Sequence, residues 1–167
     1  MKHLSARVVI ALASLTLLPA CGGAPPPSAP SALLAQSLPD FRRPALSGPS
    51  VDTAASRGHV VVVKFFAKYC EPCKRTLPAA EALHQQHPDV VFIGVAEDER
   101  ASDVQEVVDA YRLTFPVVHD TGNVLSGRYR VSEMPATFVA DGSGKVIWVG
   151  GPENTESGLA QAITAAK

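Results

Sequence analysis

The sequence lacks a block of like charges. Its 167 residues include 15 Lys and Arg and 16 Asp and Glu, which gives a formal net charge of -1, and Lys and Arg occur at most two in a row. Surfaces that bind nucleic acid or anionic lipid by charge need clustered basic residues, so we expect no nucleic-acid partner. The 46% of apolar and 19% of charged residues indicate an ordinary globular chain.

The N-terminal apolar run is too short for a permanent membrane span. Residues 8–18 would rise only about 16 Å as a helix, about half of the hydrocarbon thickness of a bilayer. Lys2 and Arg7 precede the run and small residues follow it, so residues 1–20 are interpreted as an export signal. Residues 18–21, LPAC, resemble the lipobox of bacterial lipoproteins, in which the cysteine is lipidated after cleavage. We therefore expect a protein anchored to a bacterial membrane through Cys21, facing the periplasm or the cell exterior.

A segment poor in core-forming residues follows Cys21. Residues 22–37, GGAPPPSAPSALLAQS, are rich in Pro, Ala, Ser and Gly, a composition that favours an extended chain. The sequence predicts a tether over residues 21–38 that holds a domain up to roughly 50 Å from the lipid surface. Residues 39–167 form the predicted domain, which is long enough to fold as a monomer without a disulfide.

Apolar runs alternate with helical stretches along this domain. The run VVVVKFF, interrupted only by Lys64, suits a central strand that is covered on both faces. The order β-α-β-α is followed by a third strand, a hairpin around the DGSG turn and a last helix. This order predicts a three-layer α/β domain with a mixed central sheet and helices on both faces. The expected strands are residues 60–66, 90–96, 115–120, 136–140 and 145–150, and the expected helices are residues 71–87, 104–111 and 155–166.

Two of the three cysteines stand two residues apart at a predicted strand-to-helix junction. Cys70 would lie at the helix N-terminus, where unpaired backbone N–H groups and the helix dipole stabilise a thiolate. Cys73 follows one turn later and is placed to resolve a mixed disulfide formed by Cys70. The pair therefore predicts thiol-disulfide exchange, with the redox-active Cys70–Cys73 disulfide as the only cofactor.

Other interpretations of the cysteine pair are weaker. A structural staple between residues three apart removes little entropy from the unfolded chain. His84 and His87 complete a spacing that is also found in zinc sites, but His84 would lie about 16 Å along the helix axis from Cys73. We therefore expect both histidines at a solvated helix end, and no metal site.

Two other function classes remain open as alternatives. A copper carrier would combine the two thiols with a distant histidine such as His119, after the third strand. A peroxidase on the same fold would need Pro-x3-Thr-x2-Cys ahead of the attacking cysteine, whereas Val63 and Ala67 occupy those positions.

The sequence resembles the thioredoxin superfamily, and more closely its exported TlpA/ResA-type thiol-disulfide oxidoreductases. The resemblance rests on FFAKYCEPC with Pro78 after it, on residues 115–131 and on residues 133–147. It implies a disulfide reductase outside the cytoplasm, recycled by a membrane electron donor, with substrates that include apocytochrome c. It also implies that the Met134–Pro135 bond is cis beside the cysteines and that the backbone of Met134 pairs with an extended substrate.

The active-site surroundings depart from the pattern of the family. Lys64 stands where thioredoxins often carry a buried acid, Thr76 where the cytochrome-maturation branch commonly has a glutamate, and Tyr69 where tryptophan is common. Proton transfer would then depend on water, on Glu71 or on Lys64, although a lysine stem packed below a solvated amine is the simpler interpretation of Lys64. Glu71 precedes Pro72 between the cysteines, and its charge disfavours the Cys70 thiolate, which favours a reductant over an oxidant.

Overall fold

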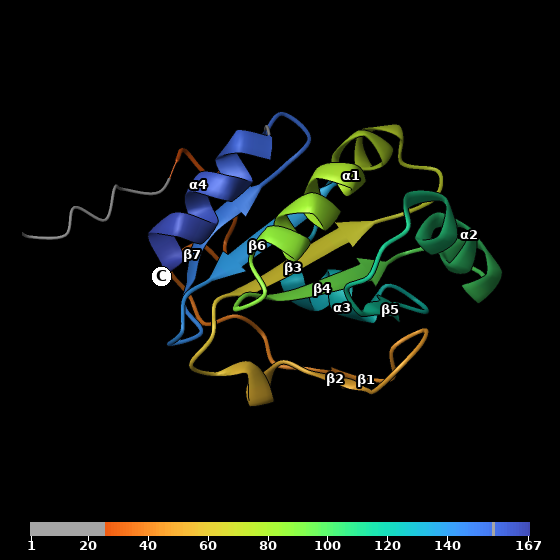
Figure 1. Ribbon diagram of the computed structural model, residues 1–167, viewed down its shortest axis with the longest axis horizontal. Coiled ribbons are helices and arrows are strands. Elements are labelled where there is room, and N and C mark those ends of the chain that lie inside the picture. Colours follow the sequence, from red (N-terminus) through yellow and green to blue (C-terminus); the bar gives the residue numbers. More distant parts are fainter. Residues whose placement is uncertain (1–25, 155) are drawn as a thin grey trace, which may run out of the picture.

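A computed structural model describes residues 26–154 and 156–167 (Figure 1). The predicted signal peptide and Cys21 lie outside the described residues. A five-stranded sheet in the order β5-β4-β3-β6-β7 forms the centre, and a two-stranded sheet, β1-β2, lies beside it. Along the described chain the elements are β1 (Arg42–Arg43), β2 (Val51–Asp52), η1 (Ala54–Ser56), β3 (Val61–Phe66), α1 (Glu71–Gln86), β4 (Val91–Ala96), α2 (Ala101–Tyr111), β5 (Val117–His119), α3 (Val124–Tyr129), β6 (Ala136–Ala140), β7 (Val146–Gly150) and α4 (Glu156–Ala166).

The central strand β3 is buried along its whole length, as the continuous apolar run predicts. It pairs in parallel with β4 and antiparallel with β6, so Lys64 lies opposite Gly94 on one side and Thr137 on the other. The connections from β3 to β4 and from β4 to β5 pass through helices, as parallel neighbours require. β6 and β7 form the predicted antiparallel hairpin, in which Gly144 has a φ of +83°.

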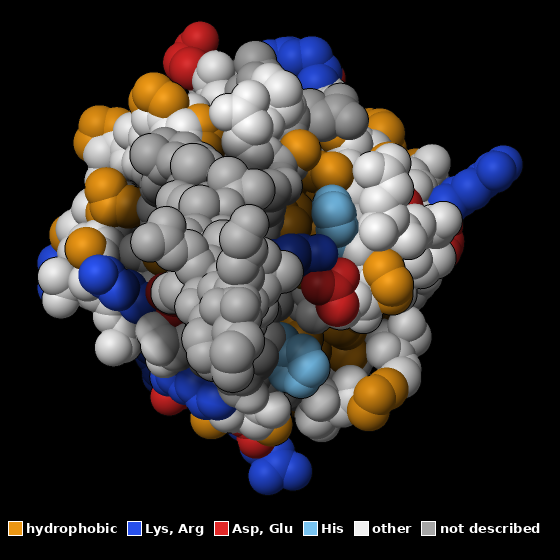
Figure 2. Space-filling view, turned by 60° about the vertical axis from the view of Figure 1, so that its left-hand side comes forward, with side chains coloured by type: hydrophobic (Ala, Val, Ile, Leu, Met, Phe, Trp, Pro, Cys, Tyr) orange, Lys and Arg blue, Asp and Glu red, His pale blue; other side chains and the backbone are white. Residues whose placement is uncertain are grey.

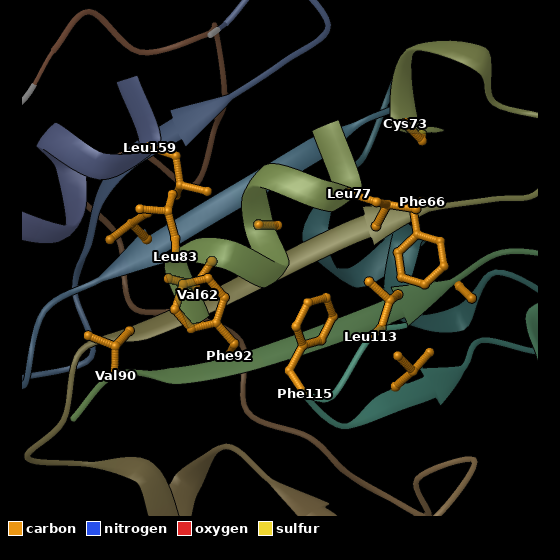
Figure 3. Packing of buried hydrophobic residues seen from close by; sticks show 14 of the residues in the cluster. Val62, Phe66, Cys73, Leu77, Leu83, Val90, Phe92, Leu113, Phe115 and Leu159 are labelled. Carbon is orange, nitrogen blue, oxygen red and sulfur yellow. The ribbon is translucent and has the colours of Figure 1, made fainter. Parts of the chain in front are cut away.

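Apolar side chains form one cluster on each face of the sheet. The first cluster holds Phe66, Cys73 and Leu77 with residues of α2 and α4, and Figure 3 shows Leu77 and Phe66 packed between α1 and the sheet. The second cluster lies on the opposite face, under α3 and the N-terminal segment, and includes Tyr129. The predicted three-layer α/β architecture is confirmed.

The sequence did not predict the short helix α3, nor the small strands β1 and β2. The helix has only six residues and too few apolar positions to show a helical period. Its N-terminus is held by Asp120, whose carboxylate accepts from the backbone N–H groups of Leu125 at 2.8 Å and Ser126 at 2.9 Å. No described helix has the length and apolarity needed to cross a membrane.

The second half of the predicted tether is packed against the domain. Ala29 N–H donates to the carbonyl of Val149, and Ala35 N–H donates to that of Val146, so this segment lies along the outer edge of β7. Leu33 and Leu38 are 8% and 3% exposed and belong to the second apolar cluster. The boundary predicted at residue 39 is therefore too late, because two leucines in a Pro- and Ala-rich segment are enough to anchor it.

Leu33 and Leu34 offer a matched test of this packing. We expect Leu33→Ala to lower the free energy of unfolding by about 2 to 3 kcal/mol, because it removes a buried side chain. Leu34 is 39% exposed, so Leu34→Ala should change stability by less than about 0.5 kcal/mol. Urea unfolding of both variants measures the difference, and equal effects would contradict the packing of residues 27–38.

Candidate active site

The junction between β3 and α1 places the cysteine pair. Cys70 is the N-cap residue of α1, and its Sγ accepts a hydrogen bond from the backbone N–H of Cys73 at 3.1 Å. Pro72 occupies the first turn, where a missing N–H leaves no helical hydrogen bond unmade. The Sγ atom of Cys70 thus lies among the unpaired N–H groups of the helix, as the sequence predicts.

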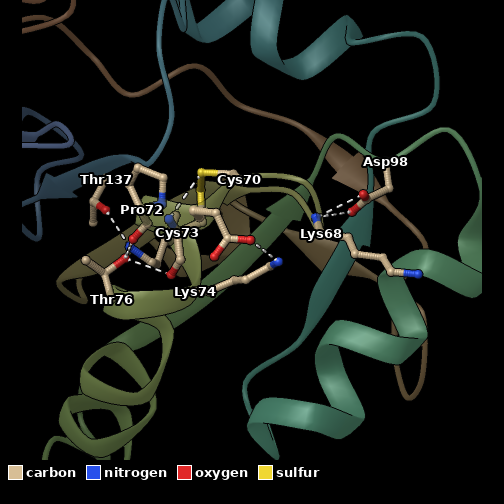
Figure 4. The surroundings of a disulfide bond; sticks show 10 residues. Lys68, Cys70, Pro72, Cys73, Lys74, Thr76, Asp98 and Thr137 are labelled. Atoms are coloured by element: carbon tan, nitrogen blue, oxygen red, sulfur yellow. Dashed lines mark hydrogen bonds and ion pairs between the residues drawn. A yellow bond between two sulfur atoms is a disulfide. The ribbon is translucent and has the colours of Figure 1, made fainter.

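Cys70 and Cys73 are joined by a disulfide (Figure 4). Cys70 is 7% exposed and Cys73 is fully buried. An incoming thiolate therefore reaches the Cys70 sulfur first. This difference supports the assignment of Cys70 as the attacking and Cys73 as the resolving cysteine.

The surface beside the disulfide carries paired charges. Glu71 Oε1 accepts from Lys74 Nζ at 2.5 Å, and the Glu71 side chain is 72% exposed. Tyr69 is 68% exposed. Partial desolvation, together with the charges of Glu97 and Asp98, raises the pKa of its hydroxyl. Tyr69 and Glu71 thus border the cysteines at the surface.

The loop before β6 brings the predicted proline to the site. The Met134–Pro135 peptide bond is cis. Met134 packs against the apolar cluster that contains both cysteines, and Pro135 lines a small cavity together with Thr76 and Lys64. Met134 and Pro135 therefore lie on the face of the sheet that carries the cysteines, and their role in binding substrate stays a prediction.

Lys64 is buried, contrary to the interpretation that its amine reaches solvent. The residue is 4% exposed, and burial lowers the pKa of its amine to about 8. Its Nζ donates to Thr137 Oγ1 at 3.3 Å. Since side chains alternate along a strand and Val62 and Phe66 belong to the cluster under α1, Lys64 points to that same face. Thr137 was not among the predicted site residues.

Acidic residues at the carboxyl end of β4 were also missed. Asp98 accepts from the backbone N–H of Lys68 at 2.9 Å and is 5% exposed. Burial and the nearby charges of Asp120 and Asp98 raise the pKa of Glu97, whose Oε1 is buried without a hydrogen bond among the described residues. The signal was present in the sequence, because these acids directly follow a buried strand.

The histidines have structural contacts. His84 is half-buried, and its ring lies 5.4 Å from that of Phe92 and 5.8 Å from that of Phe115, so the expected solvated position is wrong for this residue. His119 Nε2 lies 2.6 Å from the backbone oxygen of Asp98. Within the described residues, no group of three or more His, Cys, Asp or Glu could hold a metal ion.

Comparison with known proteins gives the family. The AhpC/TSA family pattern matches residues 34–149. The chain belongs to the AhpC/TSA family. The Thioredoxin-like protein YneN of Bacillus subtilis is 31% identical over 115 residues, which cover 66% of this chain and 67% of YneN. The Thiol-disulfide oxidoreductase ResA of the same organism is 31% identical over 121 residues, which cover 71% of this chain and 68% of ResA.

A solved structure agrees with this family membership. The secreted disulfide oxidoreductase of Mycobacterium tuberculosis that is homologous to Escherichia coli DsbE superimposes with a TM-score of 0.69 at 27% identity, covering 75% of this chain and 95% of that one. The prediction of a thioredoxin-like thiol-disulfide oxidoreductase of the ResA type is thereby confirmed.

Burial of Lys64 predicts a pH-dependent stability. The lowered pKa of about 8 lies below the ordinary value near 10.4, so between these values the unfolded chain binds more protons and stability rises with pH. The Lys64 contribution should increase by about 2 kcal/mol from pH 8 to pH 10. Urea unfolding of the oxidised wild-type protein and of oxidised Lys64→Met at both pH values isolates the Lys64 contribution. If the stability difference between the two proteins is the same at pH 8 and pH 10, the pKa shift of Lys64 is excluded.

Proposed function

We propose that this chain is an exported, lipid-anchored reductase of protein disulfides. The observation that carries the proposal is the Cys70–Cys73 disulfide at the start of α1, with only Cys70 reaching the surface. In the reduced protein, the Cys70 thiolate attacks a substrate disulfide and one substrate sulfur leaves as a thiolate. Cys73 then attacks the Cys70 sulfur, releases the second substrate thiolate and re-forms the disulfide, so that two electrons pass to the substrate.

The substrate would lie along the loop before β6. An extended peptide needs backbone groups to pair with and room beside the reacting sulfur. Met134 supplies its backbone there, and Pro135 lines the wall of the site. The substrates are proteins outside the cytoplasm, with apocytochrome c as one candidate, and a membrane electron donor restores the dithiol by reaching the same Cys70 sulfur.

Electrostatics at the surface favours the reducing direction. Glu71 adjoins Cys70 and is largely exposed. Its negative charge disfavours the Cys70 thiolate, and a less stabilised reduced form makes the couple less oxidising. The ion pair with Lys74 offsets part of the Glu71 charge. This offset is small, because an exposed ion pair contributes little.

The packed N-terminal segment brings the domain close to the proposed anchor. Pro27 is already held, because its carbonyl accepts from Trp148 Nε1 at 3.2 Å. Five residues, 22–26, then separate Cys21 from the domain, a reach of about 15 Å rather than roughly 50 Å. A lipidated Cys21 would keep the disulfide near the membrane surface, where a membrane donor is found.

On the face shown in Figure 2, charged side chains of both signs are interspersed.

The redox equilibrium tests the direction. We expect the Cys70–Cys73 couple of residues 26–167 to have a reduction potential near -270 mV, as in thioredoxin. The measurement is a dithiothreitol redox series, read by alkylation of free thiols. Cys70→Ser serves as the control that forms no disulfide. A potential near -120 mV would identify an oxidant and overturn the proposed direction.

Cys21 tests the anchor. In a bacterial host that lipidates exported proteins, the full chain should sediment with membranes, because lipid chains on Cys21 would bury their apolar surface in the bilayer. Cys21→Ser should be found in the soluble exported fraction with unchanged thiol-disulfide exchange. Ser37→Ala, which leaves the cysteine intact, is the control. Membrane association that persists in Cys21→Ser would contradict the lipid anchor.

A further inference from the structure

The buried ammonium of Lys64 has no carboxylate partner among the described residues that surround it. Its one hydrogen bond goes to a neutral hydroxyl, that of Thr137. An unpaired charge in the interior is costly, and a buried lysine is ordinarily compensated by an acid. The described residues that line the cavity at Lys64 include no acid, and its polar side chains are those of Thr76, Thr137, Trp148 and Asn154.

Thr76 contacts both the cavity at Lys64 and the backbone of the resolving cysteine. Thr76 lines the cavity from α1, and Thr76 Oγ1 donates to the backbone oxygen of Cys73 at 3.0 Å. Figure 4 shows Thr76 and Thr137 on the same side of the cysteine pair. Thr137 Oγ1 accepts the hydrogen bond from Lys64. Cys73 is fully buried and Lys64 nearly so, so a charge on one group acts on the other with little screening by water.

The two redox states differ in what they offer this ammonium. The disulfide is neutral, whereas reduction creates two sulfurs that ionise. Among the described residues, the groups that neighbour Lys64 or line its cavity carry no charge. They are Gly94 of β4, Thr137 of β6, Trp148 of β7, Thr76 of α1, Leu159 of α4 and Asn154 in the loop before α4. Glu71 and Lys74 pair with each other at the surface.

We propose that Lys64 is a positioning residue whose ammonium is the counter-charge of the Cys73 thiolate in the reduced protein. The inference rests on the proposed thiol-disulfide exchange but not on its direction. It explains a lysine at the centre of an apolar strand. The charge that destabilises the oxidised fold stabilises the sulfur anion that attacks the mixed disulfide.

Reduction of the Cys70–Cys73 disulfide takes two electrons and places the accompanying protons on defined groups. A dithiol such as dithiothreitol gives two electrons and two protons and becomes a cyclic disulfide, while the Cys70–Cys73 bond breaks. One proton goes to the Cys70 sulfur, and Cys70 releases it to water before it attacks a substrate disulfide. If Lys64 is neutral, the second proton goes to its Nζ and Cys73 remains a thiolate. If Lys64 is already charged, the second proton goes to solvent. By linkage, Lys64 lowers the thiol pKa of Cys73, and the Cys73 thiolate raises the amine pKa of Lys64 by the same amount.

Titration of a single thiol is the first test. Residues 26–167 with Cys70→Ser leave Cys73 as the one thiol, whose ionisation is followed by its absorbance near 240 nm. Adding Lys64→Met, which keeps an unbranched side chain of nearly the same length without the charge, should lower the acid dissociation constant of the Cys73 thiol at least tenfold. Lys145→Met, at the exposed end of the turn between β6 and β7, should leave this constant unchanged. A change of less than twofold in Lys64→Met would overturn the proposal.

The redox equilibrium with both cysteines present is the second readout. At pH 9, Lys64→Met should lower the equilibrium constant for reduction by dithiothreitol about tenfold. This change corresponds to a reduction potential about 30 mV more negative. An unchanged constant contradicts the counter-charge, whereas a wild-type protein that forms no disulfide contradicts the proposed function itself. If Lys64→Met fails to fold, NMR titration of the Lys64 amine in the wild-type protein decides, because its pKa must rise on reduction.

Discussion

The double-sided burial of β3 is the constraint on which the site depends. Because β3 pairs with β4 and β6 at once, its backbone has no freedom to shift, and its last residue fixes where the loop to α1 begins. The same strand delivers Cys70 to the N-terminus of α1 and holds Lys64 beneath that helix. The sheet thus sets the sulfur chemistry at its carboxyl edge and the charge below it as a single rigid unit.

The outer edge of the sheet shows a second use of backbone pairing. β7 would expose unpaired N–H and C=O groups, which invite association with other chains. Residues 29–38 cover this edge with hydrogen bonds to Val146, Val149 and Gly144, and they bury two leucines. A segment whose composition predicts a free tether therefore protects an edge of the sheet.

Sequence patterns predicted most of the architecture because burial on both faces leaves continuous apolar runs. The strands β3 and β4 and the helix α1 agree with their predicted bounds within one residue. The cysteine pair and the cis Met134–Pro135 bond were predicted from a local motif and from a family resemblance. Contacts between distant segments carry no local signal, so the packing of Leu33 and the bond from Lys64 to Thr137 needed the structure.

Glu71 and Lys64 are the two charges that we propose act on the cysteines, and water screens them to different degrees. Glu71 is adjacent to Cys70 in sequence, but it is exposed and paired with Lys74, so water and its partner screen it. Lys64 is six residues before Cys70, yet it lies in the interior with one neutral hydrogen-bond partner. Coulomb interactions grow as the local dielectric constant falls, so water screens the buried cation less than the exposed anion. In the proposed arrangement, the Lys64 cation acts on the Cys73 sulfur and the Glu71 anion acts on the Cys70 sulfur.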